Sequence, residues 1–167
     1  MTNRINLQSK IDTIFGMCCY HLLPIKQEYY IGKGNIIAIC TLSSQDLLQK
    51  IKNNNEIMEK ILIVGRLLSE NKGIDEIIKF STNNKSLQYL LLCGEEVKGH
   101  LSGQTLIALK KNGIDQNKKV INAASPYPFL VSSNDELEYF RHHINIINQI
   151  GLKDIDKIKQ IVYDIKI

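Results

Sequence analysis

The sequence has little of what marks a nucleic-acid-binding or membrane-spanning protein. Tryptophan is absent, proline occurs three times, and only three of the 21 basic residues are arginines. Because nucleic-acid-binding surfaces cluster lysine with arginine, the scattered lysines and a net charge of +4 argue against a nucleic-acid partner. No apolar run approaches the about 20 residues that span a bilayer, and charged side chains interrupt residues 1–14, where a signal peptide would carry its apolar region. We therefore expect a cytoplasmic protein without a transmembrane segment.

Cysteine pairs with the spacing of a metal or redox site are also absent. The four cysteines are Cys18, Cys19, Cys40 and Cys93, and none belongs to a CxxC motif. Cys40 and Cys93 lie inside apolar runs, so we predict that they are buried free thiols. With 167 residues, of which 44% are hydrophobic and 23% charged, the chain has the length and composition of one globular domain.

Short apolar runs alternate with segments of helical spacing along the chain. The runs are rich in Ile, Leu and Val, which is typical of strands buried on both faces, and cover residues 36–42, 61–64, 87–93 and 120–124. Helices are predicted at residues 6–15, 45–57, 73–80, 103–112, 134–150 and 152–164. Asn112 and Gly113 form a helix C-terminal signal, and Asn134 begins an acidic first turn. The alternation predicts an α/β fold, a single Rossmann-like domain with a mainly parallel sheet flanked by helices.

The loop after the third predicted strand, residues 93–104, is the most unusual part of the sequence. It holds three glycines, two glutamates, one histidine and one glutamine, and it leads directly into a helix. Ligands of open α/β sheets bind outside the carboxyl ends of the strands. Three readings stay open: His100 as a metal ligand oriented by a carboxylate, a phosphate cradle at the helix N-terminus, or an ordinary surface histidine. The glycine fingerprints of nucleotide-binding loops are missing, and Glu95 and Glu96 would repel a phosphate.

Residues 91–115 resemble the corrinoid-carrying A subunit of tetrahydromethanopterin S-methyltransferase, which is a membrane complex. The resemblance is most specific within residues 94–113, where a Glu-Val-Lys-Gly-His motif ends at His100. Further segments resemble this family's first strand, the loop and helix after its second strand, and the loop after its fourth strand, at residues 30–42, 69–78 and 123–129. The resemblance divides the chain into an N-terminal extension, a core and a C-terminal helix, at residues 1–29, 30–152 and 153–167.

The resemblance implies a methyltransferase component. In that family a corrinoid takes a methyl group from methyl-tetrahydromethanopterin and passes it to coenzyme M, and the histidine of the matching motif is the lower axial ligand of the cobalt. Here that residue is His100, the implied catalytic and cobalt-binding side chain. Cobalamin is the implied cofactor, and the other methyltransferase subunits are the implied partners. The residues implied to contact cobalamin besides His100 are Leu68, Glu70, Asn71, Gly94, Glu95, Val97, Gly99, Leu101, Gly103, Gln104, Pro126, Pro128 and Phe129.

Several positions depart from the family's pattern. Related corrinoid proteins have an aspartate two residues before the ligating histidine, whereas this chain has Lys98, so Glu95 or Glu96 becomes the candidate that orients His100. Residues 66–68 and 129–133 also differ from the usual loops. The chain stops at a polar helix where membrane-bound members continue into a linker and a transmembrane helix. We therefore expect a soluble homologue or a shortened form, at most peripheral to a membrane complex.

These departures motivate an alternative function on the same fold, a regulatory or scaffolding paralogue with weak or no corrinoid binding. A nucleotide-binding Rossmann-like enzyme is a third hypothesis, which is disfavoured because no acidic residue follows a glycine fingerprint at the expected spacing. His142 and His143 belong to the predicted helix at residues 134–150, where we expect them on a solvated face.

Overall fold

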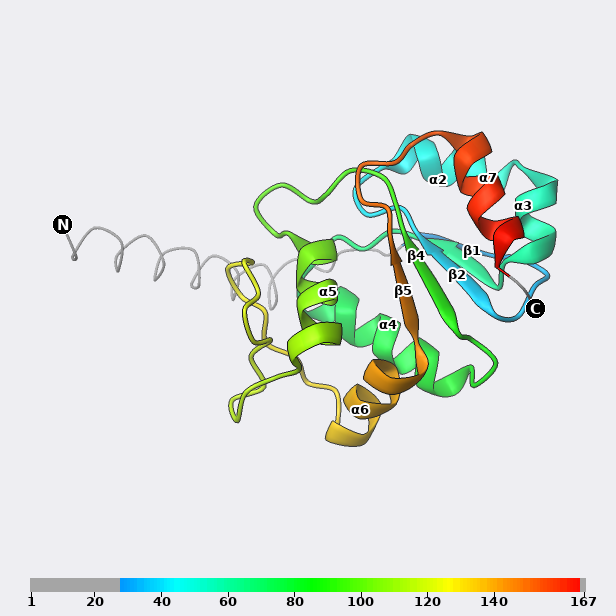
Figure 1. Cartoon of the computed structure of the whole chain (residues 1–167). Coiled ribbons are helices and arrows are strands. Elements are labelled where there is room, and N and C mark those ends of the chain that lie inside the picture. The colour runs from blue at the N-terminus through cyan, green and yellow to red at the C-terminus, as the bar shows by residue number, and fades with distance from the viewer. Residues whose placement is uncertain (1–27, 166–167) are drawn as a thin grey trace.

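Five short strands form one sheet in the order β1-β3-β2-β4-β5 in the computed structural model, which describes residues 28–165 (Figure 1). The strands are β1 (Tyr29–Ile31), β2 (Ile37–Cys40), β3 (Ile63–Gly65), β4 (Tyr89–Leu92) and β5 (Asn145–Asn148). β2 is parallel to β3 and β4, and β4 is parallel to β5, whereas β1 pairs with β3 in the antiparallel direction. The predicted mainly parallel sheet is confirmed.

Six helices of the described residues cover the two faces of the sheet. They are α2 (Gln45–Lys52), α3 (Asn55–Lys60), α4 (Lys72–Asn83), α5 (Ser102–Asn112), α6 (Asn134–His143) and α7 (Ile155–Asp164). One apolar cluster joins α4, α5 and α6 to one face, and a second joins α2, α3 and α7 to the other (Figure 1). This is the flanking-helix arrangement that the alternation of apolar runs and helical segments predicts.

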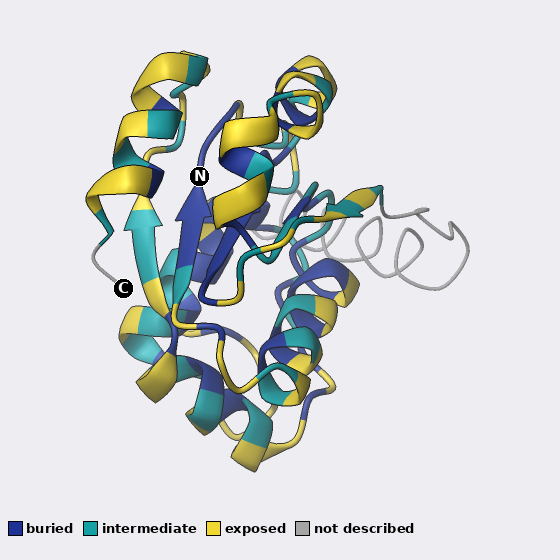
Figure 2. Ribbon diagram, turned by 90° about the vertical axis from the view of Figure 1, so that its right-hand side faces the viewer, coloured by how far each residue is buried: buried dark blue, intermediate teal, exposed yellow. Residues whose placement is uncertain are grey.

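The central strands are buried on both sides, which explains their uninterrupted apolar runs. In β2, Ala38 and Cys40 face the layer of α4, α5 and α6, while Ile37 and Ile39 face the layer of α2, α3 and α7. All four residues of β2 are buried, and the middle of the sheet is accordingly dark in Figure 2. The sheet therefore supplies a rigid base whose loops can hold a site.

The predicted helix at residues 45–57 is in fact two helices. α2 ends at Lys52, and the side chain of Asn54 then accepts a hydrogen bond from the Ile57 backbone N–H and caps α3. Asparagine is a strong N-cap residue because its side chain replaces a missing backbone partner. The helical spacing continues across this break, so periodicity alone did not reveal it.

The predicted helix at residues 134–150 is wrong beyond His143. α6 stops there, and the chain turns into β5, in which Ile146 and Ile147 point to opposite faces of the sheet. The N-cap is Ser133 rather than Asn134, with a capping box to Glu136. A short strand after a helix shares its first apolar positions with the helical stripe, and this overlap misled the prediction.

The predicted strand at residues 120–124 is also wrong. This region forms two isolated bridges, Ile114 with Val120 and Lys119 with Phe129, and Asn122 adopts a left-handed φ of 59° that ends any extended run. Two strands were missed, β1 and β5, because each is short and lies at an edge of the sheet, where exposure breaks the apolar pattern.

The remaining predictions differ in boundaries or lie outside the described residues. α4 extends to Asn83, and α7 begins at Ile155 after the cap of Asp154. Cys40 and Cys93 are buried free thiols, as predicted, whereas Cys18, Cys19 and the predicted helix at residues 6–15 lie outside residues 28–165. Within that range, no helix has both the length and the apolar character that crossing a membrane requires.

Candidate functional site

The loops after β2, β3 and β4 meet at one edge of the sheet because these strands are parallel. The chain passes from β2 to β3 on one side and then to β4 on the other, so β2 and β4 flank a topological switch point. Here the Ser43 backbone N–H donates to the Glu95 carbonyl at 3.0 Å, and the Glu95 N–H donates to Ser44 Oγ at 2.8 Å. These bonds hold the loops after β2 and β4 against each other.

Gly94 allows this close approach of the two loops. Its φ of +75° lies in the left-handed region, and a Cβ at this position would stand 2.4 Å from the Thr41 carbonyl oxygen. Only glycine fits such a contact without moving the backbone. The predicted site residue Gly94 is therefore explained by loop packing.

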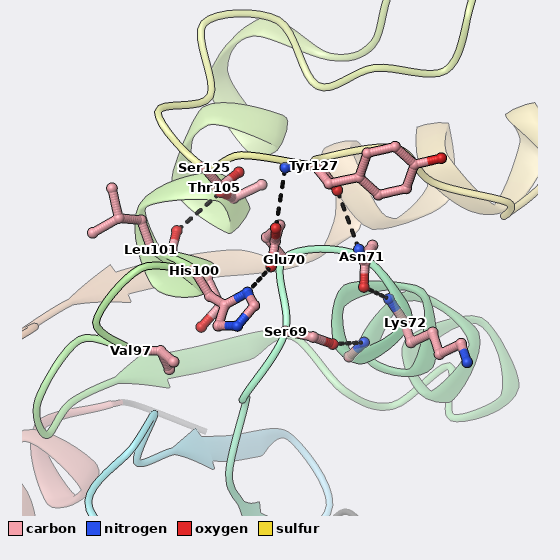
Figure 3. Close-up of polar contacts among 12 residues, drawn as sticks. Ser69, Glu70, Asn71, Lys72, Val97, His100, Leu101, Thr105, Ser125 and Tyr127 are labelled. Atoms are coloured by element: carbon pink, nitrogen blue, oxygen red, sulfur yellow. Dashed lines mark hydrogen bonds and ion pairs between the residues drawn. The ribbon is translucent and has the colours of Figure 1, made fainter. Parts of the chain in front are cut away.

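The central feature of this edge is a pair formed by His100 and Glu70 (Figure 3). His100 Nδ1 lies 2.7 Å from Glu70 Oε2, although the two residues belong to the loops after β4 and β3. The Glu70 side chain is 1% exposed and the His100 side chain 22% exposed. The hydrogen bond with Glu70 raises the pKa of the His100 imidazole above its usual value, and partial burial opposes this effect.

Glu70 is held in turn by the segment at residues 123–129. Its other oxygen, Oε1, accepts a hydrogen bond of 3.1 Å from the Tyr127 backbone N–H. The neighbouring Asn71 side chain donates to the Tyr127 carbonyl at 3.2 Å and accepts from the Lys72 backbone N–H at 2.7 Å (Figure 3). The carboxylate is therefore fixed from two sides, which fixes the imidazole that it contacts.

The contact with Glu70 determines which ring nitrogen of His100 is available. A carboxylate only accepts hydrogen bonds, so a neutral His100 carries its proton on Nδ1 and keeps the lone pair of Nε2. Among residues 28–165, no side chain or backbone group forms a hydrogen bond with Nε2. Carboxylate-bound histidines of this kind are common metal ligands because the partner fixes both the tautomer and the ring orientation.

The sequence-based assignment of Glu95 or Glu96 as the group that orients His100 is wrong. Glu96 instead accepts hydrogen bonds from the backbone N–H groups of Gly103 and Gln104, at 3.0 and 2.9 Å, and so caps the start of α5. Glu95 is exposed and pairs with Lys153, which lowers the pKa of its carboxyl group. Both glutamates shape the loop, but neither contacts the imidazole.

Hydroxyl groups anchor the start of α5 beneath His100. Ser102 Oγ donates to the Leu67 carbonyl at 2.9 Å, and Thr105 Oγ1 lies 2.7 Å from Ser125 Oγ. Leu101 adopts a left-handed φ of 46° before the helix begins. Such a conformation costs energy in a residue with a side chain, and the anchored helix start maintains it. Sequence analysis missed Ser102, Thr105, Ser125 and Tyr127, which carry no motif of their own.

The other predicted site residues surround the pair to different degrees. The Val97 carbonyl accepts from the N–H groups of His100 and Leu101, while Gly99 has φ +81° and faces open space. Gln104 is exposed, Leu68, Pro126 and Phe129 are half-buried, and Pro128 is buried. No group of three or more metal-ligating side chains exists within the described residues, so a metal at this edge would have His100 as a single protein ligand. His142 and His143 are exposed, as predicted.

Comparisons with known proteins agree with this arrangement. The MtrA family model, which describes the A subunit of tetrahydromethanopterin S-methyltransferase, matches residues 21–167. The A subunit of the Methanosarcina acetivorans "Putative methyltransferase Mtx" is 32% identical over 143 residues, which cover 84% of this chain and 68% of that protein. The A subunit of tetrahydromethanopterin S-methyltransferase from Methanocaldococcus jannaschii is 33% identical over 141 residues, which cover 83% of this chain and 56% of that protein. An A subunit of the same enzyme from Methanothermobacter marburgensis is 38% identical over 99 residues, which cover 58% and 42%.

Proposed function

Because the chain belongs to the MtrA family, that of the A subunit of tetrahydromethanopterin S-methyltransferase, we propose that it carries a corrinoid during methyl transfer, with His100 as the protein ligand of the cobalt. The observation that supports this most directly is the Glu70–His100 pair, which leaves Nε2 of a carboxylate-bound imidazole facing the carboxyl edge of the sheet. The chain spans between about two fifths and two thirds of the relatives described above, so the activity of the whole protein is part of the proposal.

The residues present fit such a group. A corrin ring supplies four of the ligands of its cobalt, so one protein nitrogen is sufficient, and this edge offers one imidazole without further ligating side chains in the described residues. Imidazole nitrogen is a suitable ligand for transition metals. The backbone at Gly99, beside His100, faces open space rather than protein atoms, which leaves room for a large planar ligand.

When bound, the corrinoid would supply a cobalt that accepts a methyl group and passes it on. The protein would position it: His100 would coordinate through Nε2, and Glu70 would keep the proton on Nδ1 and prevent rotation of the ring. The Tyr127 N–H would maintain the carboxylate in place. Contacts to the ring would come from the half-buried and exposed loop residues around the pair, namely Leu68, Val97, Leu101, Gln104, Pro126 and Phe129.

The methyl donor and acceptor are proposed from the family. The family's name implies methyl-tetrahydromethanopterin as the donor and a thiol, coenzyme M, as the acceptor, and implies that other subunits bring these substrates to the cobalt. The described loops contain no second cluster of chemistry-bearing side chains beside His100. We therefore assign substrate binding to partner subunits and cofactor binding to this chain.

A spectroscopic titration tests the cofactor assignment. The full chain is mixed with hydroxocobalamin, and the visible spectrum and the affinity are measured for the wild type, His100→Ala and His142→Ala. We expect the wild type and His142→Ala to give the same imidazole-ligated spectrum, because His142 is exposed on α6. His100→Ala should lose that spectrum.

Two results would contradict the proposal. If His100→Ala reproduces the wild-type spectrum, His100 is not the axial ligand. If the folded wild type shows no spectral change and no heat in calorimetry, the chain is instead the regulatory or scaffolding homologue that binds no corrinoid.

A further inference from the structure

A second site lies on the sheet face covered by α4 and α6, at the edge formed by β1 and β3. A cavity of about 270 Å³ opens there, and none of the residues of the Glu70–His100 pair lines it. Its walls come from β1 to β4, α4 and α6, and its main apolar side chains are Ile31, Ile63, Ile77, Phe80, Leu90 and Phe140. Apolar cavities of this size with a few polar groups are typical of small-molecule sites.

The cavity exists because α4 does not extend over the edge of the sheet. Tyr30 of β1 packs against the opposite layer, so its neighbours Tyr29 and Ile31 point to the cavity side. They are 58% and 59% exposed, among the most exposed large apolar side chains in the described part of the chain. Gly65, the strand partner of Tyr29, contributes no side chain to the floor. An exposed apolar surface next to a cavity usually marks a binding site.

Arg66 makes one end of this cavity cationic. Its Nη2 donates to the Ser43 carbonyl at 3.0 Å, but its buried Nε has no hydrogen-bond partner. Arg66 also forms no ion pair with any carboxylate of residues 28–165. A buried donor without an acceptor is costly, and guanidinium donors match the geometry of a carboxylate. The vacant donor therefore indicates an anionic acceptor.

The other polar groups of the lining do not satisfy or compete with Arg66. Burial raises the pKa of the Cys40 thiol to about 12, so this side chain is neutral. Ser81 donates its hydroxyl hydrogen to the Ile78 carbonyl within α4. Glu76 is the one carboxylate in the described lining, and it is exposed on α4, where water and salt screen its charge.

We propose that this cavity binds a small amphiphilic carboxylate, with its apolar body between β1, β3 and α4 and its carboxylate accepting hydrogen bonds from Arg66. The apolar walls would bury the body of the ligand, and the vacant Nε would select the anionic end. This site is separate from the proposed corrinoid site and does not depend on it.

Calorimetric titration of the full chain with octanoate and with octanol tests the proposal. These probes share one apolar body and differ in the charged end. We expect saturable octanoate binding and an affinity for octanol that is about tenfold weaker or less, since a hydrogen bond to a charged group is worth roughly that factor. Arg66→Gln should reduce the octanoate affinity to that of octanol.

Arg141→Gln is the matched control. Arg141 has a buried, unpartnered Nε as well, but it lies on α6, pairs with Glu138 and does not line the cavity. It should bind octanoate like the wild type. A second variant, Ile77→Phe, should fill the cavity and abolish binding of both probes, while thermal melting confirms that it is folded. The proposal is overturned if the folded wild type shows no saturable octanoate binding, if octanol binds equally well, or if Arg66→Gln binds octanoate like the wild type.

Discussion

The Nδ1 atom of His100 lies 2.7 Å from an oxygen of Glu70, a residue thirty positions earlier in the chain. The two residues meet because the loops after β3 and β4 leave the same edge of a parallel sheet. The imidazole is therefore oriented by a side chain from another loop, and that loop is itself held by the backbone of Tyr127. A change at any of these three positions should be felt at His100.

Replacing Glu70 by glutamine should change the properties of His100 without moving the fold. The amide removes the negative charge that raises the pKa of His100, so that pKa should fall towards its ordinary value of about 6.5. The affinity for hydroxocobalamin should fall by roughly ten- to a hundredfold, as is usual when the partner of a metal-binding histidine is lost. Proton NMR titration of the histidines and the visible spectrum measure the two effects.

Glu95→Gln is the control for this experiment. Glu95 lies in the same loop as His100 but is exposed and pairs with Lys153, so neither the pKa of His100 nor the cobalamin affinity should change. If Glu95→Gln alters them as much as Glu70→Gln does, the effect is a general one of charge near the loop, and the orienting role of Glu70 is refuted.

The Glu70–His100 pair also makes stability depend on pH. The folded protein holds the His100 proton more tightly than the unfolded chain does, because the pKa is raised on folding. This stabilisation is fully present below the unfolded value of about 6.5 and is lost as pH rises through the raised folded value. The difference in Tm between the wild type and Glu70→Gln should therefore be larger at about pH 6 than at about pH 9. A difference that stays constant or grows with pH would contradict this assignment.

The candidate histidine could be predicted from sequence, but its partner could not. The Gly-rich loop after an apolar run identified His100, and the structure does place it at the carboxyl edge of the sheet. Glu95 and Glu96 were chosen as partners because they are near in sequence. In a parallel sheet, however, neighbours at this edge come from different loops, and the nearest carboxylate in space is Glu70. Sequence distance carries little information about such contacts.

The fold shows the same division between local and non-local information. The apolar runs that became β2, β3 and β4 were predicted because both faces of those strands are buried. The edge strand β5 was read as an extension of α6, since Ile144 and Ile147 continue the spacing of Leu137 and Phe140. Its pairing with β4 decides its conformation, and this pairing is not encoded in the local pattern.

Asp75 in the first turn of α4 should contribute strongly to stability. Its buried carboxylate accepts hydrogen bonds from the Val131 and Ser132 backbone N–H groups and from Ser132 Oγ, which lies 2.6 Å away. Asp75→Ala would leave these donors without a partner and should reduce the free energy of unfolding by about 2–4 kcal/mol. Ser132→Ala removes a single donor and should cost about 1 kcal/mol. Urea unfolding measures both, and equal costs would show that the carboxylate does not hold this loop.

Glu96 should stabilise the start of α5 more than its neighbour Glu95 stabilises the same loop. The Glu96 carboxylate accepts the N–H groups of Gly103 and Gln104, which have no partner within the helix. Glu96→Ala should therefore lower the free energy of unfolding by about 1–2 kcal/mol. Glu95→Ala breaks only an exposed pair with Lys153 and should have an effect within about 1 kcal/mol. Urea unfolding monitored by circular dichroism compares the two variants. If Glu95→Ala proves the more destabilising of the two, the capping role assigned to Glu96 is wrong.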